Sequence, residues 1–355
     1  MTTPRAPLAA DLFCGSGSVS AALKAAGFSV TFGIDNDAAA VATYKVNHPQ
    51  TSLFCEDIKQ VSLENAATTL RGGARLSVLA VCAPCQPFSS QNRKRGAFDE
   101  RASLVLEAVR FAQYFRPETI WVENVPGIAR SSEKDQLRGA LASLGYKFGQ
   151  PLRIEASALG VPQRRVRSIF VATLSGDVLD RVEKFRTEFS GDLPSTVRQA
   201  FRGLQRLGPG EYAENDPLHF ARRHAELTVA RLRAIPIDGG SRSALPKELQ
   251  LSCHASLGNN SFPDVYGRMA WDAPSPTLTT GCTDVTRGRF AHPEEDRAIS
   301  LREAARLQSF PDSYSFVGRP TEIARLIGNA VPYEMARRMF RWLFFAEWPT
   351  ESHSP

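Results

Sequence analysis

The chain has 355 residues, of which 43% are hydrophobic and 23% charged, and its formal net charge is +6. This composition is ordinary for a globular protein and leaves room for one large α/β domain and a smaller one. The positive charge favours a polyanionic partner.

Six cysteines, at positions 14, 55, 82, 85, 253 and 282, are scattered without the pattern of a disulfide framework, so we expect a reducing cytoplasm. No second Cys-x-x-Cys or His pair accompanies Cys82 and Cys85, so we expect no metal site. The amino terminus has no apolar signal segment, and nowhere are there 18 consecutive apolar residues. We therefore expect a protein that is neither secreted nor membrane-spanning.

Strand-like and helix-like segments alternate from Leu8 to about Thr173. The expected strands are 8–13, 29–34, 51–55, 76–82, 119–123, 147–155 and 167–172, and the expected helices are 18–26, 37–47, 103–115 and 133–144. Strands spaced by helices predict an α/β fold with a doubly wound, mostly parallel sheet covered on both faces.

The alternation stops between about 174 and 267, where glycine-rich loops predominate. Ser300 and Glu303 have the spacing of a helix capping box, and a last amphipathic helix is expected to end near Phe345. We therefore expect an α/β domain over 1–175, a smaller loop-rich domain over 176–266, and a segment over 267–355 that returns to the first domain.

A cysteine stands between two prolines in the segment 83–89, directly after the apolar run 76–82. Pro84 disfavours helix at the preceding residue, so Cys85 is expected on an extended turn at the carboxyl end of a buried strand. Open α/β sheets bind their ligands at that edge. On this segment alone, a structural cysteine or half of a Cys82–Cys85 pair explains the pattern equally well.

Other polar residues follow neighbouring strands. Gly15 and Gly17 come after the first strand and suit a nucleotide-type loop, although Ser20 stands at the third small position of the dinucleotide fingerprint, and a tight turn would also explain them. Asp35 follows the second strand, where a carboxylate holds a ribose, unless Asp35 or Asp37 caps a helix. After the third strand, a carboxylate in 56–57 could accept from an adenine amino group.

Glu123 ends the fifth strand at the same expected edge as Cys85. The segment 163–167 then carries three arginines in four positions. A charge run is most often a solvated face, but arginine beside a reaction edge suits a phosphate or a carbonyl oxygen.

Taken in order, the segments 11–17, 84–86, 123–125, 163–167 and 328–332 resemble the motifs of the bacterial cytosine-C5 DNA methyltransferases. Arg101-x-x-Leu104 and the segment 302–311 extend the resemblance to about two-thirds of the chain. The chain departs from the family at Asp35, where many members have Glu, and at Ser18, where Gly is more usual.

The resemblance implies a Rossmann-like, S-adenosylmethionine-dependent methyltransferase fold acting on a flipped-out cytosine in double-stranded DNA. Cys85 would attack C6, Glu123 would serve N3 as the acid, and Arg165 and Arg167 would hold the O2 carbonyl and nearby phosphate. The cofactor residues that it implies are Phe13, Gly15, Gly17, Ser18, Asp35, Asn36, Asp57, Ile58, Pro84, Leu104 and Asn329. For Asn329, a left-handed helix end after Gly328 is a further reading.

By the same resemblance, 176–266 is expected to be a target-recognition domain, and 1–175 the catalytic and cofactor-binding domain. The expected DNA-binding residues are Gln86, Ser89, Arg222, Arg231, Arg242, Arg268 and Thr277. We expect a cytoplasmic, nucleoid-associated monomer, with a separately encoded restriction endonuclease as a possible partner.

Three other activities fit parts of the pattern. An amino-methyltransferase would have an Asp/Asn-Pro-Pro-aromatic loop, which is absent. A tRNA cytosine methyltransferase shares the 84–88 segment but also carries a Cys-Phe-Thr signature that this chain lacks. A catalytically silent, DNA-binding relative usually loses the cysteine or the glutamate, and here Cys85 and Glu123 are both present.

Overall fold

The computed structural model describes residues 6–70, 73–85, 88, 100–189, 191, 194–251 and 264–346. The chain forms two compact units. Unit 1 consists of Met1–Glu155, Val166–Gly191 and Tyr333–Pro355, and unit 2 consists of Ala156–Arg165 and Asp192–Pro332.

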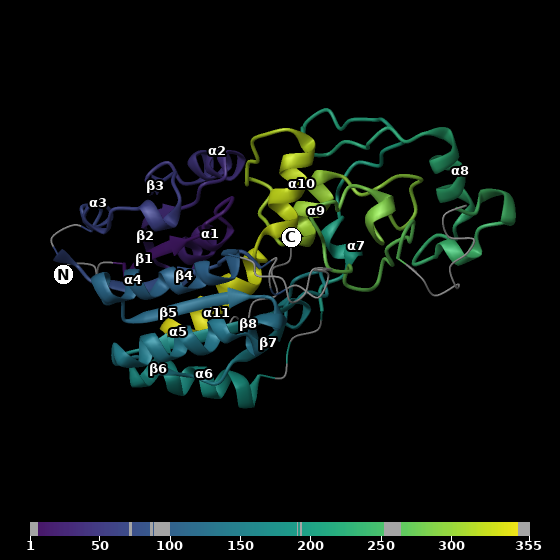
Figure 1. Ribbon diagram of the computed structural model, residues 1–355. Helices are drawn as coiled ribbons and strands as arrows, with labels where there is room; N and C mark the ends of the chain where they lie inside the picture. Colours follow the sequence, from purple (N-terminus) through teal and green to yellow (C-terminus); the bar gives the residue numbers. More distant parts are fainter. Residues whose placement is uncertain are drawn as a thin grey trace. The chain divides into compact units, whose positions relative to one another are not determined.

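Unit 1 is built on one eight-stranded sheet with the order β3-β2-β1-β4-β5-β8-β6, and β7 pairs with β8 (Figure 1). The strands are β1 Leu8–Leu12, β2 Ser29–Ile34, β3 Ser52–Phe54, β4 Leu76–Val81, β5 Thr119–Asn124, β6 Lys147–Phe148, β7 Leu152–Glu155 and β8 Val166–Thr173. The first five strands are parallel to one another, whereas β8 runs antiparallel to β5, β6 and β7. This confirms the predicted α/β class with a doubly wound, mostly parallel sheet.

Helices cover both faces of this sheet because its central strands are apolar on both sides. They are α1 Ser18–Ala25, α2 Ala38–Asn47, α3 Leu63–Ala67, α4 Glu107–Phe115, α5 Ser132–Ser143, α6 Gly176–Glu188 and α11 Tyr333–Phe345. Helices α3, α4 and α5 pack on one face around a core that includes Phe111 and Leu141. On the other face α11, yellow in Figure 1, packs against α1 and α6, and its Phe340 ring lies 4.9 Å from that of Trp121 in β5.

Two expected elements of unit 1 are divided in the structure. The expected strand 147–155 is two short strands, β6 and β7, separated by a segment that contains Gly149 and Pro151, and proline cannot donate to a strand ladder. The expected helix 103–115 is α-helical only from Glu107, because Glu100–Leu106 forms a 3-10 helix.

Helix α6 lies where the sequence predicted the start of the loop-rich domain, and that expectation is wrong for 176–188. Its apolar positions Val178, Val182 and Phe185 follow the helical repeat and are buried. Arg181 Nη1 donates to the carbonyl of Leu343 at 2.8 Å, and Trp342 Nε1 donates back to the carbonyl of Arg181 at 3.0 Å. These contacts with α11 fix α6 in unit 1.

Unit 2 contains α7 Val197–Ala200, α8 Glu226–Ala234, α9 Leu301–Leu307 and α10 Pro320–Asn329. The β pairing of its described residues consists of isolated bridges. The predicted capping box is confirmed at α9: Ser300 Oγ accepts from the Glu303 amide at 3.1 Å, and Glu303 Oε2 accepts from the Ser300 amide at 2.7 Å.

The division of the chain differs from the expected boundaries, because most of 267–355 is part of unit 2 and only the segment from Tyr333 returns to unit 1. Hydrogen bonds of two buried side chains explain why these segments belong to unit 2. Arg268 donates to the carbonyls of Leu232 and Ile235 at the end of α8. Gln163 donates to the carbonyl of Leu307 at 3.1 Å, which holds 156–165 in unit 2 as well.

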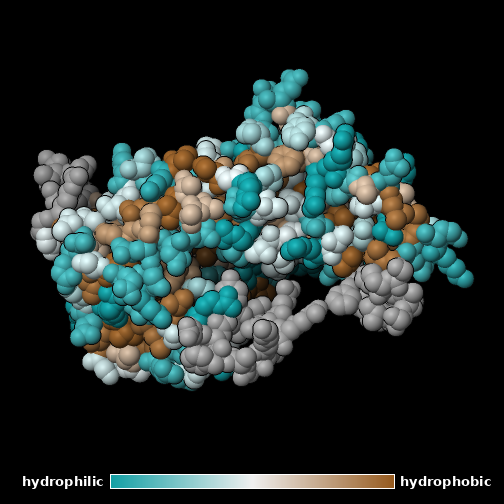
Figure 2. All heavy atoms as spheres, turned by 45° about the horizontal axis from the view of Figure 1, so that its top comes forward, coloured by the Kyte–Doolittle hydropathy of each residue, from teal (hydrophilic) through white to brown (hydrophobic). Residues whose placement is uncertain are grey.

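On the face drawn in Figure 2, hydrophilic residues cover much of the surface and hydrophobic residues form patches between them. Within the described ranges, no helix combines the length and the apolar character needed to cross a membrane.

Two glycines give a matched test of packing. A Cβ at Gly328 would collide with the carbonyl oxygen of Thr279 and lie 2.8 Å from the amide nitrogen of Thr280, whereas a Cβ at Gly139 within α5 would meet nothing within 4 Å. We expect Gly328→Ala to lower the free energy of unfolding by about 1–3 kcal/mol, because backbone must move. Gly139→Ala should raise it by about 0.5–1 kcal/mol through helix propensity. Urea titrations of both variants check this, and equal effects would contradict the close approach at Gly328.

Candidate active site

The loop of Cys85 and the end of β5 lie at one edge of the sheet. β4 and β5 are parallel, with Val81 opposite Val122, so the residues that follow each strand emerge at the same carboxyl edge. Asn124 Nδ2 donates to the carbonyl of Ala83 at 3.0 Å, and this hydrogen bond joins the two loops. Cys85 therefore lies at the same edge as Glu123, as the sequence predicted.

The neighbouring thiol, Cys82, has a different electrostatic environment. Burial raises its pKa well above the ordinary value, and the charges of Glu123 and Asp11 raise it further, while Arg167 lowers it. A thiol that keeps its proton is a poor nucleophile, so Cys82 is unsuited to covalent chemistry. No three His, Cys, Asp or Glu side chains group to hold a metal ion anywhere in the described ranges.

Arg167 contacts the carboxyl group of Glu123. Its Nε lies 2.7 Å from Glu123 Oε1, and the side chains are only 10% and 9% exposed. The antiparallel register of β8, with Ser168 opposite Asn124, brings Arg167 to this edge. Because a nearly buried ion pair is costly to separate, Arg167 fixes where the Glu123 carboxyl lies.

The loop after β1 has the backbone of a ligand-binding turn. Phe13, Gly15 and Gly17 all have left-handed φ angles, of 60°, 54° and 94°. Glycine takes this conformation freely, but a phenylalanine does so rarely, and such strain is concentrated at functional loops. Ser18 follows as the first, buried residue of α1.

Asp35 joins this loop to the end of β2. Its Oδ2 accepts from the amide of Gly15 at 2.8 Å, and its Oδ1 accepts from the amide of Asp37 at 2.9 Å. Asp37, not Asp35, is the helix cap, since Asp37 Oδ1 accepts from Ala40 at the start of α2 at 3.0 Å. Of the two readings of Asp35, the structure thus excludes the cap.

A buried polar chain that the sequence analysis missed lies under the glycine loop. Ser20 Oγ donates to Asp11 Oδ2 at 2.7 Å and lies 2.8 Å from the Tyr44 hydroxyl. Burial raises the pKa of the Asp11 carboxyl to about 7, against the lowering effect of the Ser20 hydrogen bond. Asp11 Oδ1, although buried, accepts no hydrogen bond from the described residues. In the sequence, these hydrogen bonds were indicated only by Ser20, which stands at the third small position of the glycine pattern.

His48 supports the same loop from α2. Its Nε2 lies 3.0 Å from the carbonyl oxygen of Gly17, and its Nδ1 lies 3.1 Å from Lys24 Nζ. An ammonium only donates, so Nδ1 accepts and the proton is on Nε2, which donates to Gly17. Burial first, and then the charge of Lys24, lowers the pKa of His48 to about 4, which keeps this neutral form at pH 7.

The remaining expected cofactor residues of unit 1 lie around these loops. Asn36 and Asp57 are exposed, and Asp57 Oδ1 caps the turn that follows β3 by accepting from Lys59 at 2.9 Å. Ile58 is buried. Leu104 packs on the core of the sheet, and Pro84 is half-buried before Cys85.

Two expected site residues, Arg165 and Asn329, belong to unit 2. Arg165 is 4% exposed, and its Nη1 and Nη2 donate to the carbonyls of Leu278 and Gly328, both at 3.0 Å. Asn329 is the exposed last residue of α10. The left-handed reading of Asn329 is wrong, because the described non-glycine residues with positive φ do not include it and the helix ends at Ala330 with a φ of −60°.

The expected DNA-binding residues have different surroundings. Gln86 and Ser89 lie outside the described residues. Arg222 is 58% exposed and 3.5 Å from Asp284, Arg242 is partly buried on a 3-10 turn, and Thr277 is exposed, with its hydroxyl donating to the carbonyl of Arg164. Arg231 is half-buried, and its Nε donates to the carbonyl of Leu249 at 2.9 Å.

Arg268 differs from these because its guanidinium is internal. The side chain is 1% exposed. It donates to the carbonyls of Ile235, His292, Glu295 and Leu232 and to a carboxylate oxygen of Asp296. All three of its nitrogens are used within unit 2, so this conformation has no donor for DNA and the expectation for Arg268 is corrected.

The raised pKa of Asp11 predicts a pH effect on stability. The folded state holds a proton on Asp11 that the unfolded state releases above pH 3.8, so this contribution is present at low pH and is lost as the pH rises through about 7. We expect wild type to lose on the order of 4 kcal/mol relative to Asp11→Asn across this range. Urea titrations from pH 4 to 8 measure the difference in the free energy of unfolding between the two proteins. His48 titrates with the opposite sign, but it is present in both proteins and cancels in the difference. A flat difference curve would contradict the raised pKa.

Known proteins resemble this chain in sequence and in fold. The sequence model of the family described as "C-5 cytosine-specific DNA methylase" matches residues 9–344. The Type II methylase M.HgiDII of Herpetosiphon aurantiacus is 34% identical over 334 residues, covering 92% of each chain, and the Type II methyltransferase M.PspPI of a Psychrobacter species is 30% identical, covering 92% of this chain and 76% of that one. A putative DNA modification methyltransferase from an Escherichia coli prophage has a similar fold, with a TM-score of 0.68 at 24% identity, covering 96% of this chain and 99% of that one. The chain belongs to the C-5 cytosine-specific DNA methylase family and is a DNA (cytosine-5-)-methyltransferase.

Proposed function

We propose that this enzyme methylates C5 of a flipped-out cytosine in double-stranded DNA through a transient bond between Cys85 and C6, with S-adenosylmethionine as the methyl donor. The observation that carries the proposal is the joining of two loops at one sheet edge. The Asn124–Ala83 hydrogen bond holds the loop of Cys85 next to the strand end that bears Glu123. A nucleophile and an acid from neighbouring strands are what this reaction needs.

The chemistry assigns a role to each side chain. C5 of cytosine is a weak nucleophile, and addition of the Cys85 thiolate to C6 makes C5 electron-rich, provided that N3 is protonated. Glu123 serves N3 as the acid, and Arg167, whose Nε lies 2.7 Å from Glu123 Oε1, positions its carboxyl group. When bound, S-adenosylmethionine supplies an electrophilic methyl group; loss of the C5 proton and departure of Cys85 then restore the aromatic ring.

The residues of unit 1 fit the proposed cofactor. The left-handed backbone at Gly15 and Gly17 leaves room for a ligand close to the chain, and the strained Phe13 offers a ring for the adenine. The Asp35 oxygens accept from the amides of Gly15 and Asp37, which holds this carboxylate beside the glycine loop, where a ribose diol would bind. Asp11 Oδ1 is buried and has no hydrogen-bond partner among the described residues, so a bound group can form a hydrogen bond there.

The arginines of the site divide between two roles. Arg167 touches the proposed acid and is assigned to catalysis with it. Arg165 is a positioning residue, since both terminal nitrogens fasten the backbone at Leu278 and Gly328. Arg165 therefore acts through the segment that carries Asn329.

We assign target recognition to the part of the expected 176–266 domain that belongs to unit 2, with Arg222, Arg231 and Arg242 as candidate DNA contacts. Thr277, Gln86 and Ser89 are further candidates. The support is exposure, because the guanidinium of Arg222 is on the surface. The names of the relatives place them in Type II systems. We infer a restriction–modification role, with a separately encoded endonuclease and a monomeric enzyme acting on the nucleoid.

Covalent catalysis is tested by trapping. Duplex DNA with 5-fluorocytosine at the target should form a denaturation-resistant complex with the wild-type enzyme and S-adenosylmethionine, because fluorine cannot leave as the C5 proton does. Cys85→Ala should form none, and Cys82→Ala is the matched control that should still trap. Methylation by Cys85→Ala at a rate close to wild type would exclude the mechanism. A tRNA substrate in the same assay tests whether the enzyme instead methylates tRNA.

The ribose assignment is tested by two neighbouring carboxylates. Asp35→Ala should weaken cofactor binding by about 1.5–3 kcal/mol through the loss of charged hydrogen bonds. Asp37→Ala removes the cap of α2 and should cost about 0.5–2 kcal/mol of stability with little change in cofactor affinity. Calorimetry with S-adenosylhomocysteine, and DNA binding without cofactor, separate the two effects. If Asp35→Ala weakens DNA and cofactor binding equally, the ribose assignment fails.

A further inference from the structure

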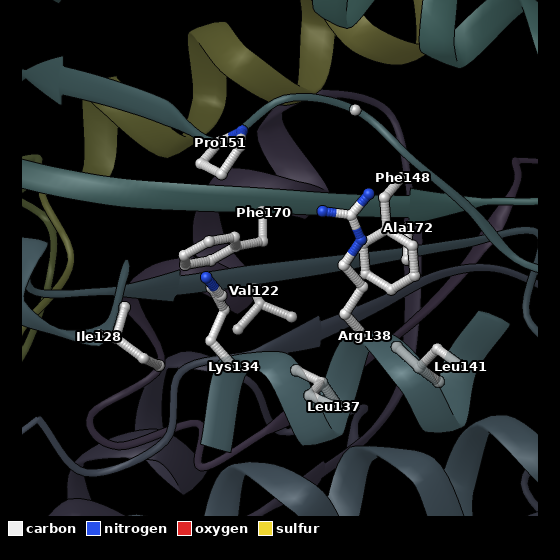
Figure 3. Close-up of a pocket in the computed structure, with 11 residues that line it drawn as sticks. Val122, Ile128, Lys134, Leu137, Arg138, Leu141, Phe148, Pro151, Phe170 and Ala172 are labelled. Carbon is white, nitrogen blue, oxygen red and sulfur yellow. The ribbon is translucent and has the colours of Figure 1, made fainter. Parts of the chain in front are cut away.

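A pocket outside the proposed methyl-transfer site opens beside α5 in unit 1 (Figure 3). Val122 of β5 and Phe170 and Ala172 of β8 form its floor, and Leu137 and Leu141 of α5 line one side. Its empty space of about 550 Å³ includes open solvent at the mouth, so the pocket is partly open.

Two cations from α5 stand at the apolar floor. Lys134 and Arg138 are four residues apart and so share one side of the helix. Figure 3 shows the Lys134 amino group directed toward the Phe170 ring and the Arg138 guanidinium beside Phe148, whose ring centroid is 5.8 Å from Arg138 Cζ.

The charges at the pocket are of one sign. None of the residues that line it is acidic. Lys134 Nζ donates to the carbonyl of Ala129 at 3.1 Å and lies 2.9 Å from Asp135, whose carboxylate is 72% exposed and outside the lining. Arg138 forms no ion pair with a carboxylate in the part of the chain that the structure describes. An anion would therefore meet at least one cation that has no acidic partner.

The pocket is separate from the methyl-transfer residues. Val122 precedes Glu123 in β5, and successive side chains of a strand point to opposite faces of the sheet. The floor belongs to the face covered by α5. A molecule bound there would not displace the substrate or the cofactor of the proposed reaction.

We propose that this pocket binds a small organic anion with an apolar body, such as a short aryl- or alkyl-carboxylate. The aliphatic and aromatic floor takes the apolar body, and the carboxylate lies between Lys134 and Arg138. The lining has no carboxylate, amide or hydroxyl side chain to recognise a base or a sugar, so a nucleotide is disfavoured.

The test uses 4-phenylbutyrate and its neutral analogue, 4-phenylbutanamide, as probes of the full-length protein. Calorimetry should show that the amide binds about three- to tenfold more weakly than the acid. Arg138→Gln and Lys134→Gln should each weaken phenylbutyrate by a similar factor and leave the amide unchanged. Arg153→Gln is the matched control, because Arg153 is exposed on β7 and outside the lining.

Methyl NMR of the wild-type protein locates the bound probe without any variant. Phenylbutyrate should shift the methyl signals of Val122, Leu137 and Leu141 before others. Equal binding of acid and amide, equal behaviour of Arg138→Gln and Arg153→Gln, or shifts elsewhere in the molecule would each overturn the proposal. None of these readouts depends on methyl transfer, so the pocket and the proposed activity succeed or fail separately.

Discussion

The hydrogen bond from Asn124 to the carbonyl of Ala83 is the contact on which the proposed chemistry depends. Parallel pairing brings the ends of β4 and β5 to one edge, but the backbone hydrogen bonds between them do not continue into the loops. Beyond β4 the chain is a loop, and Pro84 has no amide hydrogen with which to continue a ladder. Instead, the buried Asn124 side chain donates to the carbonyl of Ala83, and loss of a buried hydrogen bond is costly. A small displacement at this point would separate Cys85 from Glu123.

The proposed cofactor side is organised by polar groups that face inward. Asp35 accepts hydrogen bonds from the amides of Gly15 and Asp37, and His48 donates to the carbonyl of Gly17. These contacts fix a loop whose backbone is strained at Phe13, and the surrounding structure must compensate for that strain. Asp11 lies under the same loop. Its carboxyl group is buried, which raises its pKa, and its Oδ1 has no hydrogen-bond partner among the described residues.

The sequence predicted the sheet and the catalytic edge because both follow from local signals. Apolar runs such as 76–81 and 119–122 can only be buried strands in this context, and Cys85 and Glu123 follow them directly. The sequence did not predict α6, whose buried positions are three among many polar ones. It predicted that the chain returns to unit 1, but from residue 267, whereas the return begins at Tyr333. Membership of a unit is decided by distant partners, such as Leu307 for Gln163, and no local pattern records them. Likewise, nothing in a run of letters distinguishes Arg268, which is internal, from Arg222, which is on the surface.

Internal arginines also change how the basic composition should be interpreted. In unit 2, buried Arg268, Arg297 and Arg302 are paired with Asp296, Glu303 and Asp216. Such buried pairs stabilise the unit only if their geometry is good. Their guanidinium groups are already paired, so they are not available to bind a polyanion. However, each pair contributes zero net charge, so the formal excess of +6 is carried by cations elsewhere in the chain. The proposed attraction to DNA therefore depends on cations outside these buried pairs, and it should fall with salt as their contacts with phosphate are screened.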